Sequence, residues 1–315
     1  MATQSRVTVL LIAVLLDLAL GEPPSRWHPV AWIGRLIAAG RALAPRRSAS
    51  GLVLHGALVV IAALGISAAA ALAAERALGV VAGPIAPLLQ GALLKLASSL
   101  ARLFGAVALV RGHLVAGDLE GARRELGIHL VSRPTAGLGS GAVASAAIES
   151  LAENLTDSWV APMFFFWVFP TGGLAAAWAY RAVNTADAMI GYRDGDLEYL
   201  GRAAARMDDA LNFIPARLAA LSIVAAAGLA RTSPLGAWRA LRRDARRTAS
   251  PNAGQTMAAM AGALGVCLEK RGYYRLGMGP APDVEAIDRA VRVARRAVAL
   301  SLGAALLALA AVARA

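Results

Sequence analysis

Long apolar stretches alternate with short polar segments along this chain, and the length of each apolar stretch predicts a helix. The stretch over 52–74 contains only His55 as an ionisable residue, and it exceeds the ~20 residues that cross a bilayer. A first membrane helix is predicted over 7–20, where Asp17 argues against a cleaved signal peptide. A third membrane helix, kinked or partly interfacial, is predicted over 83–110. The other apolar helices are predicted over 160–183, 211–230 and 297–312.

The polar segments predict surface helices and turns. Amphipathic or charged helices are predicted over 30–44, 231–247 and 280–296, with a small-residue helix over 256–268 and turns over 250–254 and 272–277. The sequence Pro-Thr-Gly-Gly over 170–173 interrupts an apolar stretch, which predicts either one kinked helix or a re-entrant pair of half-helices. Simple counting of the apolar segments places the loops 184–210 and 231–296 on opposite sides of the membrane. If both loops serve one active site, at least one apolar segment between 160 and 230 does not fully cross the membrane.

Composition supports the membrane interpretation. Hydrophobic residues make up 58% of the 315 residues and the mean hydropathy is +0.58, which is too apolar for an ordinary soluble domain. We therefore predict an all-α, multi-pass integral membrane protein of the inner or plasma membrane, with one integrated domain over 1–315. The single cysteine, Cys267, excludes an internal disulfide and a multi-cysteine metal site, and we expect it to be a small buried hydrophobe.

The net charge of +12 does not predict nucleic-acid binding. All but two of the 32 basic residues are arginines, and they gather in loops, as on the cytoplasmic side of a membrane protein. No aromatic residues alternate with the basic ones to stack on bases. The only lysines, Lys95 and Lys270, lie far in sequence from the acidic clusters, which disfavours a lysine-based covalent mechanism.

Acidic and amide residues gather at three places beside apolar sequence. Glu149, Glu153 and Asp157 are spaced by four, so a helix would place them on one face. The other two clusters comprise Asn184 with Asp187, and Asp208, Asp209 with Asn212. Unpaired charges are costly in a membrane, so the clusters indicate a functional site, the alternatives being a solvated acidic face or pairing with arginines.

Carboxylates and asparagines without a cysteine or histidine cluster favour a hard cation such as Mg²⁺ together with phosphates. Arginines can hold phosphate or carboxylate groups through two hydrogen bonds; the candidates are Arg133, Arg181, Arg193, Arg202 and Arg206. The glycine-rich segment 137–141 precedes a predicted helix, and it is either an anion site or a flexible turn. The chemistry indicated is phosphoryl or acyl activation by positioning and electrostatics.

An ordered series of motifs resembles the CobD/CbiB family, the adenosylcobinamide-phosphate synthases of cobalamin biosynthesis. The matching residues run from about 15 to about 280: Asp17, Gly21-Glu22-Pro23, His28-Pro29-Val30, Val131-Ser132-Arg133, Glu149, Ala152-Glu153-Asn154, Asp157, Ala161-Pro162, Tyr180-Arg181-Ala182, Asn184-Thr185, Asp187, Met189-Ile190-Gly191-Tyr192, Gly201, Ala204-Ala205-Arg206, Asp208-Asp209, Asn212, Pro215-Ala216-Arg217 and Ser250-Pro251-Asn252-Ala253-Gly254. The chain departs from the family at Pro134, where the family commonly has Asp, and in a shorter segment after Tyr274.

The resemblance implies an ATP- and Mg²⁺-dependent ligase that joins adenosylcobyric acid to aminopropanol phosphate or ethanolamine phosphate. It implies that the corrinoid is a substrate, that membrane lipid surrounds the chain, and that protein partners are further copies or other cobalamin-pathway membrane enzymes. Residue chemistry and the resemblance together give the expected roles. The expected catalytic residues are Glu153, Asp157, Asp187, Asp208 and Asp209. Of these, Glu153, Asp157, Asp208 and Asp209 are expected to hold the metal. The expected substrate-binding residues are Arg133, Asn154, Arg181, Asn184, Arg206, Asn212 and Asn252.

Two other classes of protein stay open. An intramembrane Mg²⁺-dependent prenyltransferase also uses acidic motifs beside membrane helices, but its usual pair of aspartate-rich motifs is not reproduced here. A corrinoid transporter or scaffold without enzymatic activity would explain intramembrane polar residues as a pathway. It would not explain why acids and arginines gather near helix ends.

Overall fold

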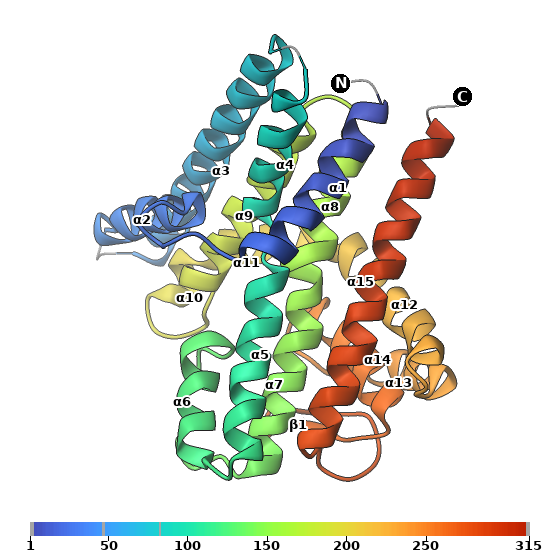
Figure 1. Cartoon of the computed structure of the whole chain (residues 1–315). Coiled ribbons are helices and arrows are strands. Elements are labelled where there is room, and N and C mark those ends of the chain that lie inside the picture. Colours follow the sequence, from blue (N-terminus) through green and yellow to red (C-terminus); the bar gives the residue numbers. More distant parts are fainter. Residues whose placement is uncertain (1–2, 46–47, 82, 313–315) are drawn as a thin grey trace. The chain divides into compact units, whose positions relative to one another are not determined.

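The computed structural model describes residues 3–45, 48–81 and 83–312, and most of these residues are helical (Figure 1). The chain divides into two compact units, each built from separate stretches of sequence. Unit 1 comprises Met1–Ser99, Ala161–Asn212 and Ala305–Ala315, and unit 2 comprises Leu100–Val160 and Phe213–Ala304. The presence of one integrated domain over 1–315 stays a prediction.

Unit 1 is a bundle of helices. Its elements are α1 (Thr3–Leu20), α2 (Pro29–Ala42), α3 (Ala49–Gly79), α4 (Ile85–Ala97), α8 (Ala161–Val168), α9 (Gly173–Ile190), α10 (Leu197–Leu200) and α11 (Arg202–Leu211). Helix α9 packs against α2, α3, α8 and α11, and α1 packs against α4. The predicted break over 170–173 is confirmed, because α8 ends at Val168 and Gly172 adopts φ +75° immediately before α9.

Unit 2 combines helices with one short hairpin. Its elements are α5 (Leu100–Val115), α6 (Leu119–His129), α7 (Ser140–Leu155), the π-helical turn η1 (Thr156–Val160), α12 (Phe213–Leu229), α13 (Pro234–Asp244), α14 (Ala253–Leu264), β1 (Leu268–Lys270), β2 (Tyr274–Leu276) and α15 (Val284–Val312), whose last residues belong to unit 1. Helix α14 packs against α7, α12 and α13, and β1 packs against α7. The core of unit 2 is therefore centred on α7 and α14.

Helix α3 is long and apolar enough to cross a membrane. Its 31 residues correspond to a length of about 46 Å, against about 30 Å for the hydrocarbon core of a bilayer. Leu54, Leu58 and Ile61 are more than half exposed and follow each other at helical spacing, so one face of α3 has a row of exposed apolar side chains. Such a face is typical of a helix in contact with lipid.

Within the described residues, α3 alone meets the criteria for a span by itself, and up to three spans result if each of two bent helix pairs counts as one. The pairs are α4 with α5 and α11 with α12. The predicted first span, now α1, is a helix but is not among these candidates. Helix α8 has eight residues, or about 12 Å, and is too short to cross a bilayer alone. The multi-pass arrangement stays a prediction.

Small residues allow close packing in unit 1. A Cβ atom added to Gly56 in α3 would lie 1.8 Å from the carbonyl oxygen of Leu200, so the end of α10 approaches the backbone of α3 where no side chain intervenes.

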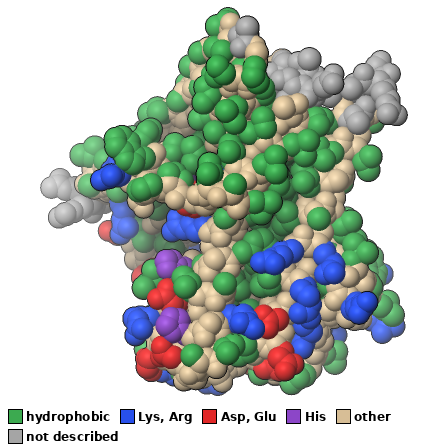
Figure 2. All heavy atoms as spheres, in the orientation of Figure 1, with side chains coloured by type: hydrophobic (Ala, Val, Ile, Leu, Met, Phe, Trp, Pro, Cys, Tyr) green, Lys and Arg blue, Asp and Glu red, His purple; other side chains and the backbone are tan. Residues whose placement is uncertain are grey.

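On the face drawn in Figure 2, hydrophobic side chains cover much of the surface of α1, α3 and α4. Charged side chains in that view gather over α6 and the N-terminal half of α15.

The structure corrects the predicted elements in the C-terminal part. The helix predicted over 256–268 ends at Leu264, because Gly265 adopts φ +67° and terminates it. Leu268 instead begins β1, which pairs antiparallel with β2, so the all-α prediction misses a hairpin. The two helices predicted over 280–296 and 297–312 are one helix, α15, since a change from charged to apolar side chains does not by itself end a helix.

Three further boundaries differ. The helix predicted over 83–110 is two helices, because Ser98 is extended and its hydroxyl donates to the Lys95 carbonyl oxygen at 3.0 Å. The helix predicted over 52–74 is longer at both ends, since α3 extends from Ala49 to Gly79. The polar segment 184–210 is largely helical, in α9, α10 and α11.

Candidate functional site

The predicted site residues fall into two groups, one in each unit. Unit 1 contains Arg181, Asn184, Asp187, Arg206, Asp208, Asp209 and Asn212. Unit 2 contains Arg133, Glu153, Asn154, Asp157 and Asn252.

In unit 1, a row of hydrogen bonds connects α9 with α11 through Asp208. Asn184 donates from Nδ2 to Asp208 Oδ1 at 3.3 Å, and Asn212 donates from Nδ2 to Asp208 Oδ2 at 3.0 Å. Arg181 donates from a terminal nitrogen to Asn184 Oδ1 at 3.1 Å, and the Tyr180 hydroxyl donates to Asn212 Oδ1 at 3.0 Å. We call these five residues the Asp208 network.

Local helix geometry builds this network. Arg181 and Asn184 are three residues apart on α9, and Asp208 and Asn212 are four apart at the end of α11, so each pair shares a helix face. Arg181 also donates from Nε to the carbonyl oxygen of Ala97 at 2.7 Å, at the last residue of α4. Because Asn184 Oδ1 faces Arg181, its amide nitrogen must face Asp208, which fixes the orientation of the carboxylate.

The structure places the other predicted residues of unit 1 nearby or outside the network. Asp187 lies one turn after Asn184, and a Cβ atom at Gly191 would meet its Oδ1 at 1.9 Å. The carboxylate of Asp187 therefore packs on the bare Cα of Gly191. Asp209 adjoins Asp208 on α11 and is partly buried, whereas Arg206 is exposed.

A second polar group in unit 1 contains residues that the sequence analysis did not place in the site. The buried Lys95 Nζ donates to the carbonyl oxygen of Gly21 at 2.5 Å and lies 3.0 Å from Glu22 Oε1 and 4.0 Å from Asp17 Oδ1. His28 accepts the N–H of Val30 at Nδ1, so its Nε2 carries the hydrogen that reaches Glu22 Oε2 at 2.8 Å. We call Asp17, Glu22, His28 and Lys95 the Lys95 group.

The Lys95 group explains why Asp17, Glu22 and His28 occur together in the N-terminal motif of the sequence. Burial opposes ionisation of Glu22, yet hydrogen bonds from His28 and Lys95 hold the pKa of Glu22 below its usual value. The segment after α1 is thereby fastened to α4 through charges that balance each other. Lys95 itself could have indicated this group from the sequence, because a lysine within apolar sequence requires an acidic or polar partner.

In unit 2, Glu149 is the centre of a buried hydrogen-bonded group. The side chain of Ser145 donates to Glu149 Oε1 at 2.6 Å, and the hydroxyl of Tyr274 in β2 donates to Oε2 at 2.7 Å. Arg133 lies 3.9 Å from the same carboxylate. Burial and the charge of Glu149 raise the pKa of Tyr274 well above its usual value, so the hydroxyl stays a hydrogen-bond donor.

The predicted residues around Glu149 are spread along α7 and beyond it. Glu153 is exposed on α7, and Asn154 donates to the carbonyl oxygen of Ser150 at 2.9 Å. Asp157 lies in the π-helical turn η1, so the regular α-helical spacing expected for three acids ends at Leu155. The buried Asn252 accepts from Arg217 at 3.4 Å at the start of α14.

Asp244 is a further buried carboxylate that the sequence analysis missed. Arg243 donates to it through two bonds of 2.6 and 2.9 Å, and Gly277 donates from its backbone at 2.9 Å. Arg247 lies 3.1 Å from Oδ1. Burial opposes ionisation of Asp244, but these donors lower the pKa below its usual value. Asp244 therefore fastens α13 to the segment that follows the hairpin.

The residues present fit Mg²⁺ only as a partly hydrated ion. No group of three or more His, Cys, Asp or Glu side chains among the described residues could hold a metal by itself. Mg²⁺ usually keeps several waters and is bound by one or two carboxylates with substrate phosphates. The Asp208 carboxylate, which accepts one hydrogen bond from Asn184 and one from Asn212, suits such a role.

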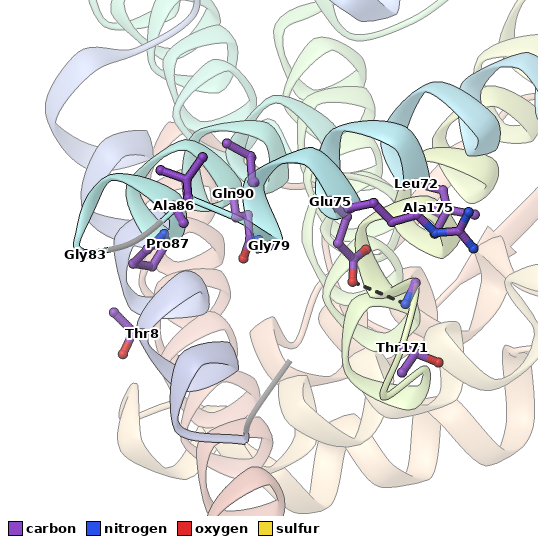
Figure 3. Close-up of a pocket in the computed structure, with 14 residues that line it drawn as sticks. Thr8, Leu72, Glu75, Gly79, Gly83, Ala86, Pro87, Gln90, Thr171 and Ala175 are labelled. Carbon is purple, nitrogen blue, oxygen red and sulfur yellow. Dashed lines mark hydrogen bonds between the residues drawn. The ribbon is translucent and has the colours of Figure 1, made fainter.

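Unit 1 also contains a cavity of about 960 Å³ between the end of α3, the start of α4 and the start of α9. Its lining includes none of the predicted site residues. Glu75 extends toward the α8–α9 connection and accepts the N–H of Gly172 at 3.2 Å (Figure 3). Glu75 thus stabilises the start of α9, and we assign no ligand to this cavity.

Comparison with known proteins identifies related sequences across almost the whole chain. The family described as CobD/Cbib protein matches residues 10–302. A probable cobalamin biosynthesis protein CobD of Methanothermobacter thermautotrophicus is 43% identical over 273 residues, 87% of each chain. The cobalamin biosynthesis protein CobD of Geobacter metallireducens is 45% identical over 269 residues, 84% of this chain and 82% of the relative. No solved structure matches this chain.

Proposed function

This chain belongs to the CobD/CbiB family, and we propose that it is an adenosylcobinamide-phosphate synthase of cobalamin biosynthesis. The observation that carries the proposal is the similarity, over more than four-fifths of both chains, to proteins named for cobalamin biosynthesis. The reaction joins a carboxylate of adenosylcobyric acid to the amine of aminopropanol phosphate or ethanolamine phosphate through an amide bond.

The proposed reaction has two steps. The corrinoid carboxylate attacks the terminal phosphorus of ATP, which gives an acyl phosphate and ADP. The amine then attacks the acyl carbon, and the C–O bond to phosphate breaks, so that inorganic phosphate leaves as the amide forms. One proton leaves the amine, and a carboxylate of this chain accepts it.

The chemistry of the Asp208 network supports this proposal. Two neutral amide donors, Asn184 and Asn212, orient the carboxylate of Asp208 and do not neutralise its charge. Such a carboxylate suits a metal ligand or a proton acceptor. Bound Mg²⁺ would neutralise phosphate charge, with Asp208 and Asp209 as its ligands in unit 1 and Glu153 and Asp157 as the candidates in unit 2.

The arginines and asparagines complete the proposed roles. Arg133 and the exposed Arg206 are proposed to contact substrate phosphates. Arg181 donates to Ala97 and to Asn184, so we propose that it positions Asn184 in addition to binding substrate. The apolar, exposed face of α3 supports a location in the cell membrane, where the substrates would be bound at its surface.

The proposal is tested with purified protein in detergent, Mg-ATP, adenosylcobyric acid and aminopropanol phosphate. Mass spectrometry would measure the condensed corrinoid, with Asp208→Asn as the site variant and the exposed Asp194→Asn as the matched control. We expect product from the wild type and from Asp194→Asn, and at least a hundredfold less from Asp208→Asn.

Each other outcome points to a different conclusion. An absence of product with either amino-alcohol phosphate would contradict the ligase, and corrinoid uptake into vesicles without covalent change would then indicate a transporter. Release of diphosphate from an isoprenoid substrate would indicate a prenyltransferase. Equal product from all three proteins would retain the ligase and exclude an essential role for Asp208.

A further inference from the structure

A smaller cavity in unit 2 has a lining rich in arginine. It measures about 390 Å³ and lies between the start of α7, the hairpin β1–β2 and the segment before α15. We call it the arginine cavity, because Arg133, Arg271 and Arg275 line it together with a single carboxylate, Glu269. The lining therefore has two positive charges in excess.

The arginines of this cavity are only weakly engaged by the acids around them. Arg275 Nε lies 3.8 Å from Glu269 Oε2, and Arg133 lies 3.9 Å from Glu149 Oε2, both beyond ordinary hydrogen-bond length. Arg271 forms no ion pair within the part of the chain that the structure describes. Three guanidinium groups at one cavity that has a single carboxylate in its lining favour an anionic ligand.

The first turn of α7 adds hydrogen-bond donors to the same cavity. Gly139 occupies the N-cap position and offers no side chain to cap the helix, so the N–H groups of the following residues have no side-chain partner there. A Cβ atom added to Gly139 would meet nothing within 4 Å. The space in front of this helix end is therefore open, and the positive end of a 16-residue helix adjoins it.

The walls of the arginine cavity are fixed by backbone contacts. The backbone of Glu269 donates to Ser145 at 3.0 Å, which attaches β1 to α7, and Cys267 donates to the carbonyl oxygen of Pro280 at 2.9 Å. Gly279 adopts φ +132°, and a Cβ atom there would lie 2.1 Å from the carbonyl oxygen of Gly265. A cavity with fixed walls binds its ligand without a large ordering cost.

We propose that the arginine cavity binds the phosphoryl group of a phosphorylated substrate. Three arginines and an uncapped helix end suit a dianionic phosphate ester better than a monoanionic carboxylate, and the excess of two positive charges matches its charge near pH 7. A volume near 390 Å³ suits a small ligand and not a whole corrinoid. The choice of aminopropanol phosphate and ATP as phosphate sources rests on the proposed function, whereas the binding of a phosphoryl group does not.

The test measures binding directly, by isothermal titration of the full chain in detergent. The probes are inorganic phosphate, aminopropanol phosphate, a non-hydrolysable Mg-ATP analogue, and acetate as the carboxylate comparison. Gly139→Asp places a carboxylate at the N-cap, where it caps α7 and repels an anion, so it removes the site without weakening the helix. Arg271→Gln removes one cation, and Arg292→Gln on the exposed surface of α15 is the matched control.

We expect the wild type to bind phosphate more tightly than acetate. Gly139→Asp and Arg271→Gln should each weaken phosphate binding about tenfold or more, with unchanged melting temperature, and Arg292→Gln should stay within about twofold. The phosphorylated substrate that loses affinity in both variants identifies which phosphate the cavity holds. Unchanged binding of every probe in both variants would overturn the proposal.

The condensation assay separates this inference from the proposed function. If the variants lose phosphate binding and the wild type forms no amide product, the cavity stands and the ligase does not. If the wild type forms product and both variants bind phosphate normally, the ligase stands and the cavity does not.

Discussion

The hydroxyl of Tyr274 donates to Glu149 at 2.7 Å, although 125 residues separate the two positions in the sequence. This bond joins the hairpin to α7 at Glu149, a residue that is 5% exposed. Ser145 completes the group from the same helix as Glu149. The protonated hydroxyl of Tyr274 therefore helps to hold the hairpin on α7.

Replacing Tyr274 with Phe should destabilise the protein by about 1–3 kcal/mol, because a buried carboxylate oxygen loses its donor while the ring still packs. Thermal unfolding in detergent would measure the loss. Tyr273→Phe is the control, because this neighbouring ring is 74% exposed. Equal melting temperatures for the two variants would show that the bond to Glu149 adds nothing to stability.

Asp208→Asn should leave the fold intact. The new amide can place its oxygen toward Asn184 and its nitrogen toward Asn212, whose own amide can then turn so that Tyr180 accepts a hydrogen bond. Only the charge is removed, so the melting temperature should change by no more than a few degrees. Asp208→Leu, which cannot form these bonds, should lower it clearly. A large loss in Asp208→Asn would mean that the charge itself stabilises unit 1.

Lys95→Met should be among the most damaging single substitutions in unit 1. It leaves the carboxylates of Glu22 and Asp17 without their buried cation, and breaking such a pair costs about 3–5 kcal/mol. Expression and melting temperature in detergent would measure the effect. Lys270→Met, at the only other lysine, should change stability little.

A double variant checks the reason for the Lys95 effect. If uncompensated charge causes the loss, adding Glu22→Gln to Lys95→Met should restore part of the stability. Additive losses in the double variant would show that packing of the lysine chain, rather than its charge, is responsible.

Asp244 should make stability depend on acid pH. Its folded pKa is lowered, so its contribution is present above its unfolded pKa of about 3.9 and is lost as the pH falls through the folded value. Melting temperatures between pH 7 and pH 3 should fall less steeply below pH 4 for Asp244→Asn than for the wild type. The exposed Glu285→Gln is the control, and parallel curves for all three proteins would contradict this prediction.

Elements set by local chemistry could be predicted from the sequence. The break at Pro170–Gly173, the helix over Pro29–Ala42 and the long apolar helix α3 follow from residue type and periodicity alone. The buried state of Cys267 is also confirmed. Membership of the CobD/CbiB family, which the ordered motifs indicated, is confirmed as well.

Features that depend on distant partners could not be predicted. The hairpin exists because Leu268–Lys270 and Tyr274–Leu276 pair with each other and β1 packs on α7, and three-residue strands have no clear periodicity. The spacing of Glu149, Glu153 and Asp157 indicated one helical face, but η1 cannot be recognised from spacing. The glycine-rich segment before α7 was recognised as an anion site or a turn, whereas Arg271 and Arg275 come from a part of the chain about 130 residues later.

The interleaving of the two units has a consequence for biosynthesis. The chain enters unit 2 at Leu100, leaves it after Val160 and returns at Phe213. Each unit is therefore translated in separate pieces, and neither is complete before part of the other has been made. At about 5–20 residues per second, a ribosome that has just added Glu149 needs roughly 6–25 s to reach Tyr274. During that time Glu149 in the nascent α7 lacks its partner Tyr274, which has not yet been synthesised. Premature termination before the hairpin would leave unit 2 unable to form.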